Sequence, residues 1–286
     1  MSRFDSSVHA GDYRAVGGSW IVSVLSGKGG VGKSVLAFNL AERIGSQGNR
    51  VLLVDADFSS GNIHILANAS CETGVRQFSS GQLSLRDAVV PVLDGVDVLG
   101  AGGDGPAEAW QDVQATARLV ERLRDQGSHY DVIVVDHSSG VSDPATVIAQ
   151  GSDLNLLVLV PELTSIADAY GLYKYLLQAG DRMDAFVLVN RTQSDREAEY
   201  IHGKFSALAE RFLGRAPGLI GYLPEDEAVR KAVASQVPVA VAMPQSPVVQ
   251  ALSELGQELL GLRKSSRTGT QVKAINKTTA AADIRG

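Results

Sequence analysis

Residues 20–34 read WIVSVLSGKGGVGKS, an apolar run followed directly by a glycine-rich segment. The pattern Gly-x4-Gly-Lys-Ser spans Gly27 to Ser34 and lies between a strand-like run and a helical pattern, which is the setting of a phosphate-binding P-loop. Glycines permit backbone angles closed to other residues, so N–H groups can turn toward phosphate oxygens at the positive end of the following helix. The segment therefore predicts a nucleotide-binding P-loop rather than an ordinary glycine-rich turn.

The polar side chains of this loop have expected roles. Lys33 would reach the β- and γ-phosphates of ATP, and the hydroxyl of Ser34 would bind Mg²⁺. The run VIVVD at 132–136 is an apolar strand that ends in a carboxylate, so Asp136 would hold Mg²⁺ through a water. The residues expected to contact the nucleotide here are Gly27, Lys28, Gly29, Gly30, Val31, Gly32, Lys33, Ser34 and Val35.

Apolar runs and helical patterns alternate from Trp20 onward. We predict strands over 20–25, 50–55, 96–99, 130–136, 154–160, 185–190 and 218–222, and helices over 34–45, 112–125, 165–178, 194–212, 225–234 and 247–262. Continuous apolar strands separated by helices indicate a parallel sheet that is covered on both faces. The predicted fold is therefore α/β, a P-loop NTPase with a doubly wound, mostly parallel sheet. Residues 1–18 are expected to be a flexible leader, 19–262 the ATPase domain and 263–286 a basic, disordered tail.

Composition narrows the class of protein. The longest apolar runs are strand-sized, no signal pattern precedes them, and Cys71 is the only cysteine of the 286 residues, which together favour the cytoplasm. The six basic residues and one acid after Leu262 leave 20 basic and 31 acidic residues in the remainder. Such an acidic body is a poor general surface for nucleic acid, so we expect DNA binding to be absent.

Lys28 makes the loop more specific than a general P-loop. A second lysine directly after the first glycine resembles the deviant Walker A segment of the MinD/ParA group, whose members dimerise with ATP between the subunits. By that resemblance Lys28 would cross to the phosphates of the partner and stabilise charge in the transition state. The alternative is a solvated loop lysine.

The resemblance implies roles for further side chains. Asp55 and Asp57 end the second strand, where Asp57 would orient the attacking water and Asp55 would support the Mg²⁺ shell; alternatively the pair only caps residues 62–66. Asn190 closes a later strand and would read adenine, unless it merely caps a turn. Pro224, Glu225 and Asp226 follow the last strand and could pack against the other side of the base. His137 is expected to lie near the metal without binding it.

Blocks outside the P-loop resemble the flagellar-number regulators of the FlhG (FleN or YlxH) type. They are DADFSSGNIH at 55–64, DHSSGVSD at 136–143, PELTSIADAY at 161–170 and GYLPEDEAVRKAV at 221–233. The resemblance implies a role in placing or counting flagella, with an FlhF-like GTPase, a flagellar regulator or a switch-complex protein as partner. The FlhF-stimulating segment of many relatives is missing from 1–18.

Localisation follows the same resemblance. The protein is expected in the cytoplasm, and the helix at 247–262, with its apolar residues at helical spacing, is expected to pack on the sheet. The alternative is that this helix and the basic tail bind peripherally at the inner face of the membrane or cell pole.

Other functions remain open at this point. A ParA-like partition ATPase would share the site and bind DNA, and a localisation scaffold would bind nucleotide without turnover. An iron–sulfur carrier is excluded, because Cys71 alone cannot supply two ligands per chain.

Overall fold

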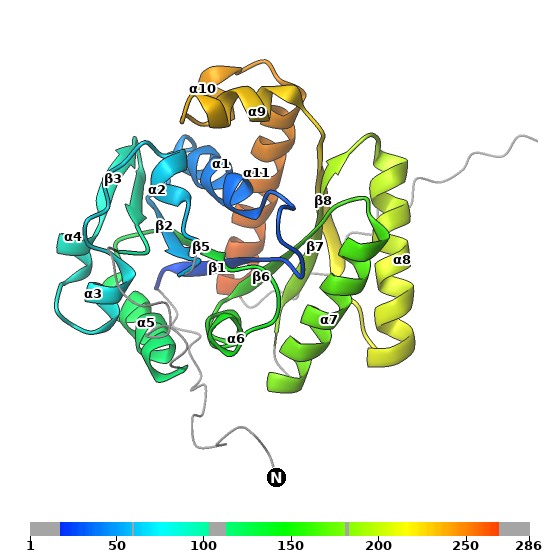
Figure 1. Ribbon diagram of the computed structural model, residues 1–286, viewed down its shortest axis with the longest axis horizontal. Coiled ribbons are helices and arrows are strands. Elements are labelled where there is room, and N and C mark those ends of the chain that lie inside the picture. Colours follow the sequence, from blue (N-terminus) through cyan, green and yellow to red (C-terminus); the bar gives the residue numbers. More distant parts are fainter. Residues whose placement is uncertain (1–17, 59, 103–112, 181–182, 269–286) are drawn as a thin grey trace, which may run out of the picture.

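The computed structural model describes residues 18–58, 60–102, 113–180 and 183–268. Within these ranges the strands form one eight-stranded sheet in the order β3-β4-β2-β5-β1-β6-β7-β8 (Figure 1). The strands are β1 (Trp20–Leu25), β2 (Val51–Ala56), β3 (Val90–Leu93), β4 (Val96–Leu99), β5 (Val132–His137), β6 (Leu154–Leu159), β7 (Ala185–Thr192) and β8 (Gly218–Pro224). All neighbours are parallel except β3 and β4, which are antiparallel. The predicted α/β fold is confirmed.

Helices cover both faces of this sheet (Figure 1). The helices on one side, where α1 packs on α11, are α1 (Lys33–Gly45), α2 (Ile63–Leu66), α9 (Glu227–Ala234), α10 (Val239–Ala242) and α11 (Pro247–Thr268). Those on the other side are α3 (Val75–Ser79), α4 (Leu85–Ala88), α5 (Val113–Gln126), α6 (Asp143–Gln150), α7 (Leu163–Ala179) and α8 (Asp195–Leu213). The layers follow from the strands, because both faces of each central strand are apolar.

Alternate residues of β1 show how the two layers are filled. Val22 and Val24 belong to the core beneath α1 and α11, whereas Ile21 packs with the core beneath α5. Leu25 joins a third cluster with α7 and α8. Strand β1 therefore lies at the centre of the molecule, and the loop that follows it emerges at the carboxyl edge of the sheet.

Several elements were not predicted. Strand β3 is short, contains Pro91 and lies at the edge of the sheet, where a missing N–H is tolerated. Helix α6 has a local signal, because Ser142 caps it and Pro144 stands in its first turn. Helices α2, α3, α4 and α10 are each one turn or little more, too short for a clear period.

The last helix is longer than predicted, whereas its apolar face packs on the sheet as expected. Helix α11 continues to Thr268, so residues 263–268 are helical, although we expected them in the disordered tail. Its apolar residues Val248, Leu252, Leu255 and Leu259 are buried against α1 and β8. The apolar face of this helix therefore belongs to the core, as expected for a helix that packs on the sheet, and this face is not available to a membrane. Residues 1–17 of the expected leader and 269–286 of the tail lie outside the described residues.

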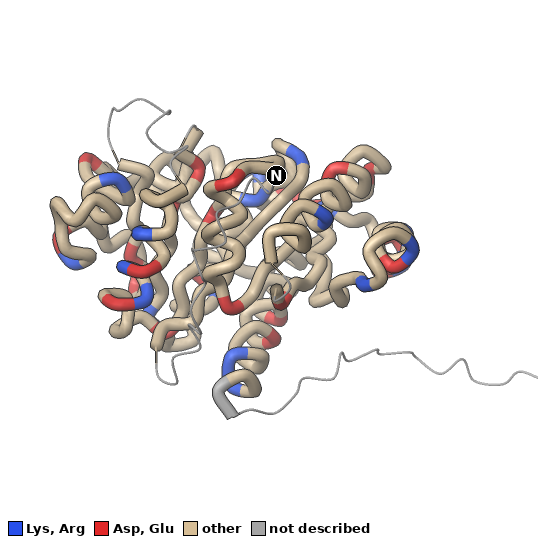
Figure 2. Tube along the Cα trace, turned by 90° about the horizontal axis from the view of Figure 1, so that it is seen from below, with Lys and Arg blue, Asp and Glu red and all other residues tan. Residues whose placement is uncertain are grey.

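Charge is mixed over the described surface. Figure 2 shows Lys and Arg interspersed with Asp and Glu along most of the chain. Basic residues Arg263 and Lys264 occur together near the end of α11, where Arg263 Nη2 also pairs with Asp131 Oδ1 at 3.1 Å. Among the described helices, none combines the length and apolar character that crossing a membrane requires.

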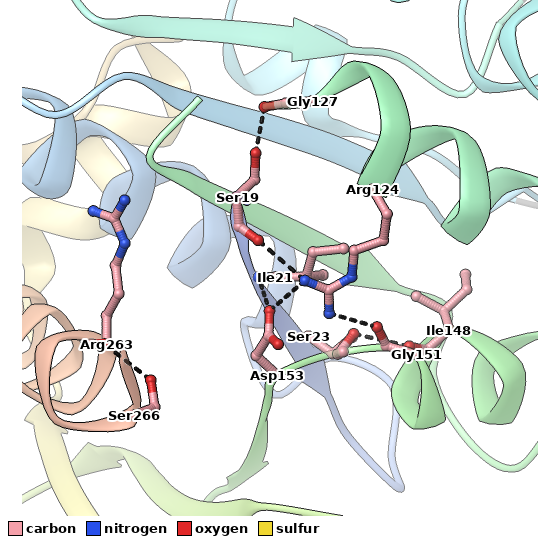
Figure 3. Close-up of polar contacts among 11 residues, drawn as sticks. Ser19, Ile21, Ser23, Arg124, Gly127, Ile148, Gly151, Asp153, Arg263 and Ser266 are labelled. Carbon is pink, nitrogen blue, oxygen red and sulfur yellow. Dashed lines mark hydrogen bonds and ion pairs between the residues drawn. The ribbon is translucent and has the colours of Figure 1, made fainter. Parts of the chain in front are cut away.

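A polar network joins elements at the amino edge of the sheet, opposite the loop (Figure 3). Arg124 of α5 donates to Ser19 O at 3.0 Å, to Asp153 Oδ2 at 2.7 Å and to Gly151 O at 2.9 Å. Asp153 Oδ2 also accepts the N–H of Ile21 at 2.7 Å. The arginine thus fastens the starts of β1 and β6 to α5, and leaves the carboxyl edge free for a site.

Candidate nucleotide-binding site

The glycine-rich loop adopts a conformation that only glycines favour. Gly30 has φ of 78° and Gly32 has φ of 89°, both in the left-handed region. Gly32 is the N-cap of α1 and provides no side-chain cap, so no side chain at that position competes for the first N–H groups of the helix. The positive end of α1 therefore faces the loop as a site for an anion.

Gly27 is required for a different reason, namely close packing. A Cβ at Gly27 would lie 2.2 Å from the carbonyl carbon and oxygen of Asp168 in α7. Backbone atoms cannot move aside as a flexible side chain can. The start of the loop is therefore held directly against α7.

Lys33 and Asp136 form a buried ion pair at the base of the loop. Lys33 Nζ lies 3.0 Å from Asp136 Oδ1, and the side chains are 5% and 0% exposed. Burial raises the pKa of Asp136 above its usual value, although Lys33 and Ser34 act in the opposite direction. The structure thus brings together the P-loop lysine, the P-loop serine and the carboxylate at the end of β5.

A second buried carboxylate lies beside this pair. Asp55 of β2 is in register with Asp136 of β5 and is fully buried. Burial, and then repulsion by Asp136, raise the pKa of Asp55 to about 7. Its carboxylate also accepts the N–H of Ile63 at 3.1 Å, so the alternative capping role at the start of α2 is realised as well.

These carboxylates and Ser34 fit a Mg²⁺ site. Asp136 Oδ2 is buried and has no hydrogen-bond partner in the described part of the chain. Mg²⁺ prefers oxygen ligands, and the orphaned oxygen lies beside a second carboxylate and the serine hydroxyl. The residues predicted to hold the metal, Ser34, Asp55 and Asp136, are therefore adjacent in the structure.

Asp57 lies nearby at the rim. Its N–H donates to Asp55 Oδ1 at 3.2 Å, and its Oδ1 accepts the N–H of Ser60 at 3.1 Å. Its charge contributes to the raised pKa of both Asp55 and Asp136. Asp57 is therefore half-buried and close to the candidate metal site.

Lys28 has different partners from Lys33, because it contacts the start of α7. Its ammonium pairs with Glu162 and donates to Thr164 Oγ1 at 3.2 Å. Hydrogen bonding to Lys28 and its charge lower the pKa of Glu162. Glu162 and Thr164 were not predicted as site residues; they belong to the block 161–170 that resembles the flagellar regulators. Lys28 therefore lies at the rim in a partly exposed ion pair, and its role toward a partner's phosphates stays a prediction.

Asn190 reaches the loop from β7. Its Nδ2 donates to Val31 O at 2.8 Å, and its Oδ1 accepts the N–H of Arg191 at 3.0 Å. Asn190 therefore joins the P-loop to β7. It also closes a turn, which is the alternative role that the sequence left open for this residue. Arg191, which was not predicted, lies beside it.

Two residues that follow β8, Glu225 and Asp226, contact different parts of the structure. Glu225 is exposed, and its Oε2 lies 3.9 Å from Arg191 Nε. Asp226 instead caps two helices, because Oδ1 accepts from Ala228 N at 2.9 Å and Oδ2 accepts from Ser246 and Val248. Although burial acts to raise it, these hydrogen bonds hold the pKa of Asp226 below its usual value. Asp226 is therefore committed to capping, whereas Pro224 and Glu225 stand nearer to Arg191.

His137 follows Asp136 and is buried. Its Nε2 lies 2.8 Å from Ser23 Oγ, and burial lowers its pKa to about 3. The imidazole is therefore neutral beside Lys33, and its only hydrogen bond among the described residues joins β5 to β1.

Known proteins share this architecture and its loop. A family model described as the CobQ/CobB/MinD/ParA nucleotide binding domain matches residues 22–239. The antiactivator FleN of Pseudomonas aeruginosa is 33% identical over 240 residues, covering 84% of this chain and 85% of that protein. The flagellum site-determining protein YlxH of Helicobacter pylori is 24% identical over 196 residues, covering 68% of this chain and 65% of that protein.

A solved structure agrees with the sequence matches. The crystal structure of the cell division ATPase MinD from Pyrococcus furiosus has a TM-score of 0.72 and 25% identity, and covers 85% of this chain and 99% of that chain. The family model spans most of the chain, including the P-loop, Asp136 and Asn190. The chain therefore belongs to the MinD/ParA family of nucleotide-binding domains, with FleN among its relatives.

Proposed function

We propose that this protein is an ATP-dependent switch that dimerises around ATP, hydrolyses it slowly and regulates the placement or number of flagella. One observation carries the proposal: the loop presents two lysines at different depths. Lys33 is 5% exposed and pairs with Asp136, whereas Lys28 lies at the rim with 35% of its side chain exposed. The inner lysine suits the phosphates bound by its own chain, and the outer one suits a ligand shared with a second copy.

The chemistry assigned to the site is phosphoryl transfer to water. The oxygen of a water attacks the γ-phosphorus, the bond to the β,γ-bridging oxygen breaks, and ADP leaves; one water proton stays on the phosphate formed and the other passes to a phosphate oxygen or to solvent. Asp57 orients that water by accepting its hydrogen bond, and Lys33 offsets negative charge on the β- and γ-phosphates. Ser34, Asp136 and Asp55 would hold Mg²⁺, which would offset negative charge on the phosphates.

Exposed apolar side chains on both sides of Lys28 support dimerisation. Leu163, next to the Glu162 that binds Lys28, is 77% exposed. Val141 is 49% exposed on the loop after β5, and Gly140 of that loop donates to Ser26 O at 2.9 Å. Both residues therefore flank the P-loop, where a facing subunit would cover them.

The pathway is proposed from the relatives. FleN is named an antiactivator and YlxH a flagellum site-determining protein, and both match most of this chain. We assign a cytoplasmic switch whose ATP-bound dimer contacts an FlhF-like GTPase, a flagellar regulator or a switch-complex protein. Deletion of the gene in its source organism should change the number or position of flagella, and the wild-type gene should restore them. Unchanged flagellation would refute this pathway.

ATP-dependent assembly is tested with light scattering coupled to size-exclusion chromatography. Asp57→Ala with ATP and Mg²⁺ should elute as a dimer, because hydrolysis is blocked while the loop is intact. Adding Lys28→Ala to this variant should give a monomer that still binds ATP. A monomer for Asp57→Ala under every nucleotide condition would contradict the sandwich.

Turnover and DNA binding separate the alternatives. Phosphate release by the wild type should exceed that of Asp57→Ala; equal rates with every activator tried would leave a scaffold without hydrolysis. In a filter-binding assay with ATP, DNA retention should be weak, because Lys and Arg are interspersed with Asp and Glu along the described chain (Figure 2). Strong, salt-sensitive retention would instead indicate a partition ATPase.

A further inference from the structure

Strand β7 ends in a bulge that changes the direction of two consecutive side chains. Val189 pairs with Tyr222 and Thr192 pairs with Pro224, so Asn190 and Arg191 together stand opposite Leu223 alone. Arg191 has φ of 60°, a left-handed conformation that is unusual for a residue with a side chain. In a regular strand two neighbouring side chains would point to opposite faces. A bulge with an extra residue removes that alternation, and bulges are frequent next to active sites.

Both side chains consequently reach the same part of the P-loop. A Cβ at Gly32 would lie 2.8 Å from Asn190 Nδ2, and 3.6 Å and 3.8 Å from Nη2 and Nε of Arg191. The amide and the guanidinium therefore lie side by side against Gly32, which is the last residue before α1. A nucleotide with its phosphates in the loop would extend past this pair.

Asn190 retains the hydrogen-bonding capacity that a purine edge requires. An amide side chain has two N–H donors and two lone pairs on its oxygen. One donor is used on Val31 O and one lone pair on Arg191 N–H. The remaining donor and acceptor match the adjacent acceptor and donor of adenine, a pairing that asparagine makes in other recognition sites.

The guanidinium of Arg191 lies next to this amide and is only loosely engaged. Half of the side chain is exposed, and its ion pair with Glu225 is 3.9 Å long. The described residues give the guanidinium no hydrogen bond. A planar, permanently charged group that is weakly hydrated stacks well on an aromatic ring.

We propose that Arg191 is a base-positioning residue whose guanidinium lies over the face of the adenine ring that Asn190 reads at its edge. Glu225, the exposed residue after β8, offers the guanidinium a loose second contact at 3.9 Å. The bulge in β7 is the device that makes both contacts possible, because it directs two successive side chains to one ligand. This inference rests on the ATP-binding function proposed above.

The test compares the affinities of two nucleotides that share ribose and phosphates but differ in the base. Wild type, Arg191→Ala and Arg191→Lys are titrated with ADP, and UDP is measured by competition against labelled ADP. Arg86→Ala, an exposed arginine on α4, is the matched control. Circular dichroism and thermal midpoints without nucleotide establish that each variant folds. Alanine and lysine at position 191 would adopt the same left-handed backbone conformation as arginine, so the backbone strain is unchanged.

Arg191→Ala should bind ADP about three- to thirty-fold more weakly, the range of a cation–π contact. Its preference for ADP over UDP should fall, because the larger purine face loses its partner. Arg191→Lys should remain weakened, since lysine retains the charge but not the plane. Equal weakening of ADP and UDP, full recovery in Arg191→Lys, or unchanged ADP affinity in Arg191→Ala would each overturn the assignment. Failure of the wild type to bind ADP would refute the proposed function itself.

Discussion

Removal of the Lys33 side chain should destabilise the protein even when no nucleotide is present. Lys33 Nζ lies 3.0 Å from Asp136 Oδ1 in a site where neither side chain is more than 5% exposed. Breaking a buried pair by removing one partner costs about 3–5 kcal/mol, because the remaining charge loses its compensation. Asp136 already has a raised pKa and can take up a proton, so we expect Lys33→Ala to cost about 3 kcal/mol, the lower end of that range.

The assay is urea unfolding followed by circular dichroism in EDTA without nucleotide. Lys33→Ala should lower the midpoint with an unchanged slope, because the surface exposed on unfolding is the same. Lys28→Ala is the matched control, and its midpoint should shift little, since Lys28 is 35% exposed and its partner Glu162 is 54% exposed.

A double-mutant cycle checks the cause of this loss. Once Asp136 is replaced by Asn, removal of Lys33 no longer leaves an unpaired charge. The double variant should therefore be more stable than the two single losses predict, with a coupling of about 1–3 kcal/mol. Additive losses in the cycle, or equal shifts for Lys33→Ala and Lys28→Ala, would refute the reasoning.

Three further changes test other parts of the structure. Gly27→Ala places a Cβ 2.2 Å from the backbone of Asp168, so the thermal midpoint and ADP affinity should both fall; a wild-type midpoint would contradict this packing. Leu163→Glu should leave ADP binding intact and weaken the ATP-dependent dimer of Asp57→Ala, whereas an undiminished dimer in light scattering would exclude this surface. Asp226→Ala removes the acceptor of three hydrogen bonds and should cost about 1–3 kcal/mol in urea at pH 7. Because the folded-state pKa of Asp226 is lowered, its carboxylate stabilises the fold at pH values above the unfolded-state pKa of 3.8. The difference in free energy of unfolding between wild type and Asp226→Ala should therefore shrink as the pH falls below 3.8. A difference that stays constant with pH would show that the charge is not involved.

The sequence was sufficient for the features that depend on neighbouring residues. The strands of the central sheet are continuous apolar runs, so their positions could be read from composition with errors of one or two residues at the ends. The loop from Gly27 to Ser34 and the carboxylate at Asp136 are likewise local patterns, and the structure places Lys33 on Asp136 as the parallel order of β1 and β5 requires. The edge strand β3 was missed because a short run with a proline has no clear period.

Only the tertiary structure decided which side chains from distant parts of the chain meet. Lys28 and Glu162 pair because α7 begins beside the P-loop, and no local pattern encodes that contact. The apolar face of α11 could have met a membrane or the core, and its packing on α1 settled the choice. Arg191 lies at Gly32 because β7 bulges against β8, which depends on how two strands pair. The P-loop was therefore determined by the sequence alone, whereas the partners of its rim and of the adjoining base site depended on contacts between residues far apart in the chain.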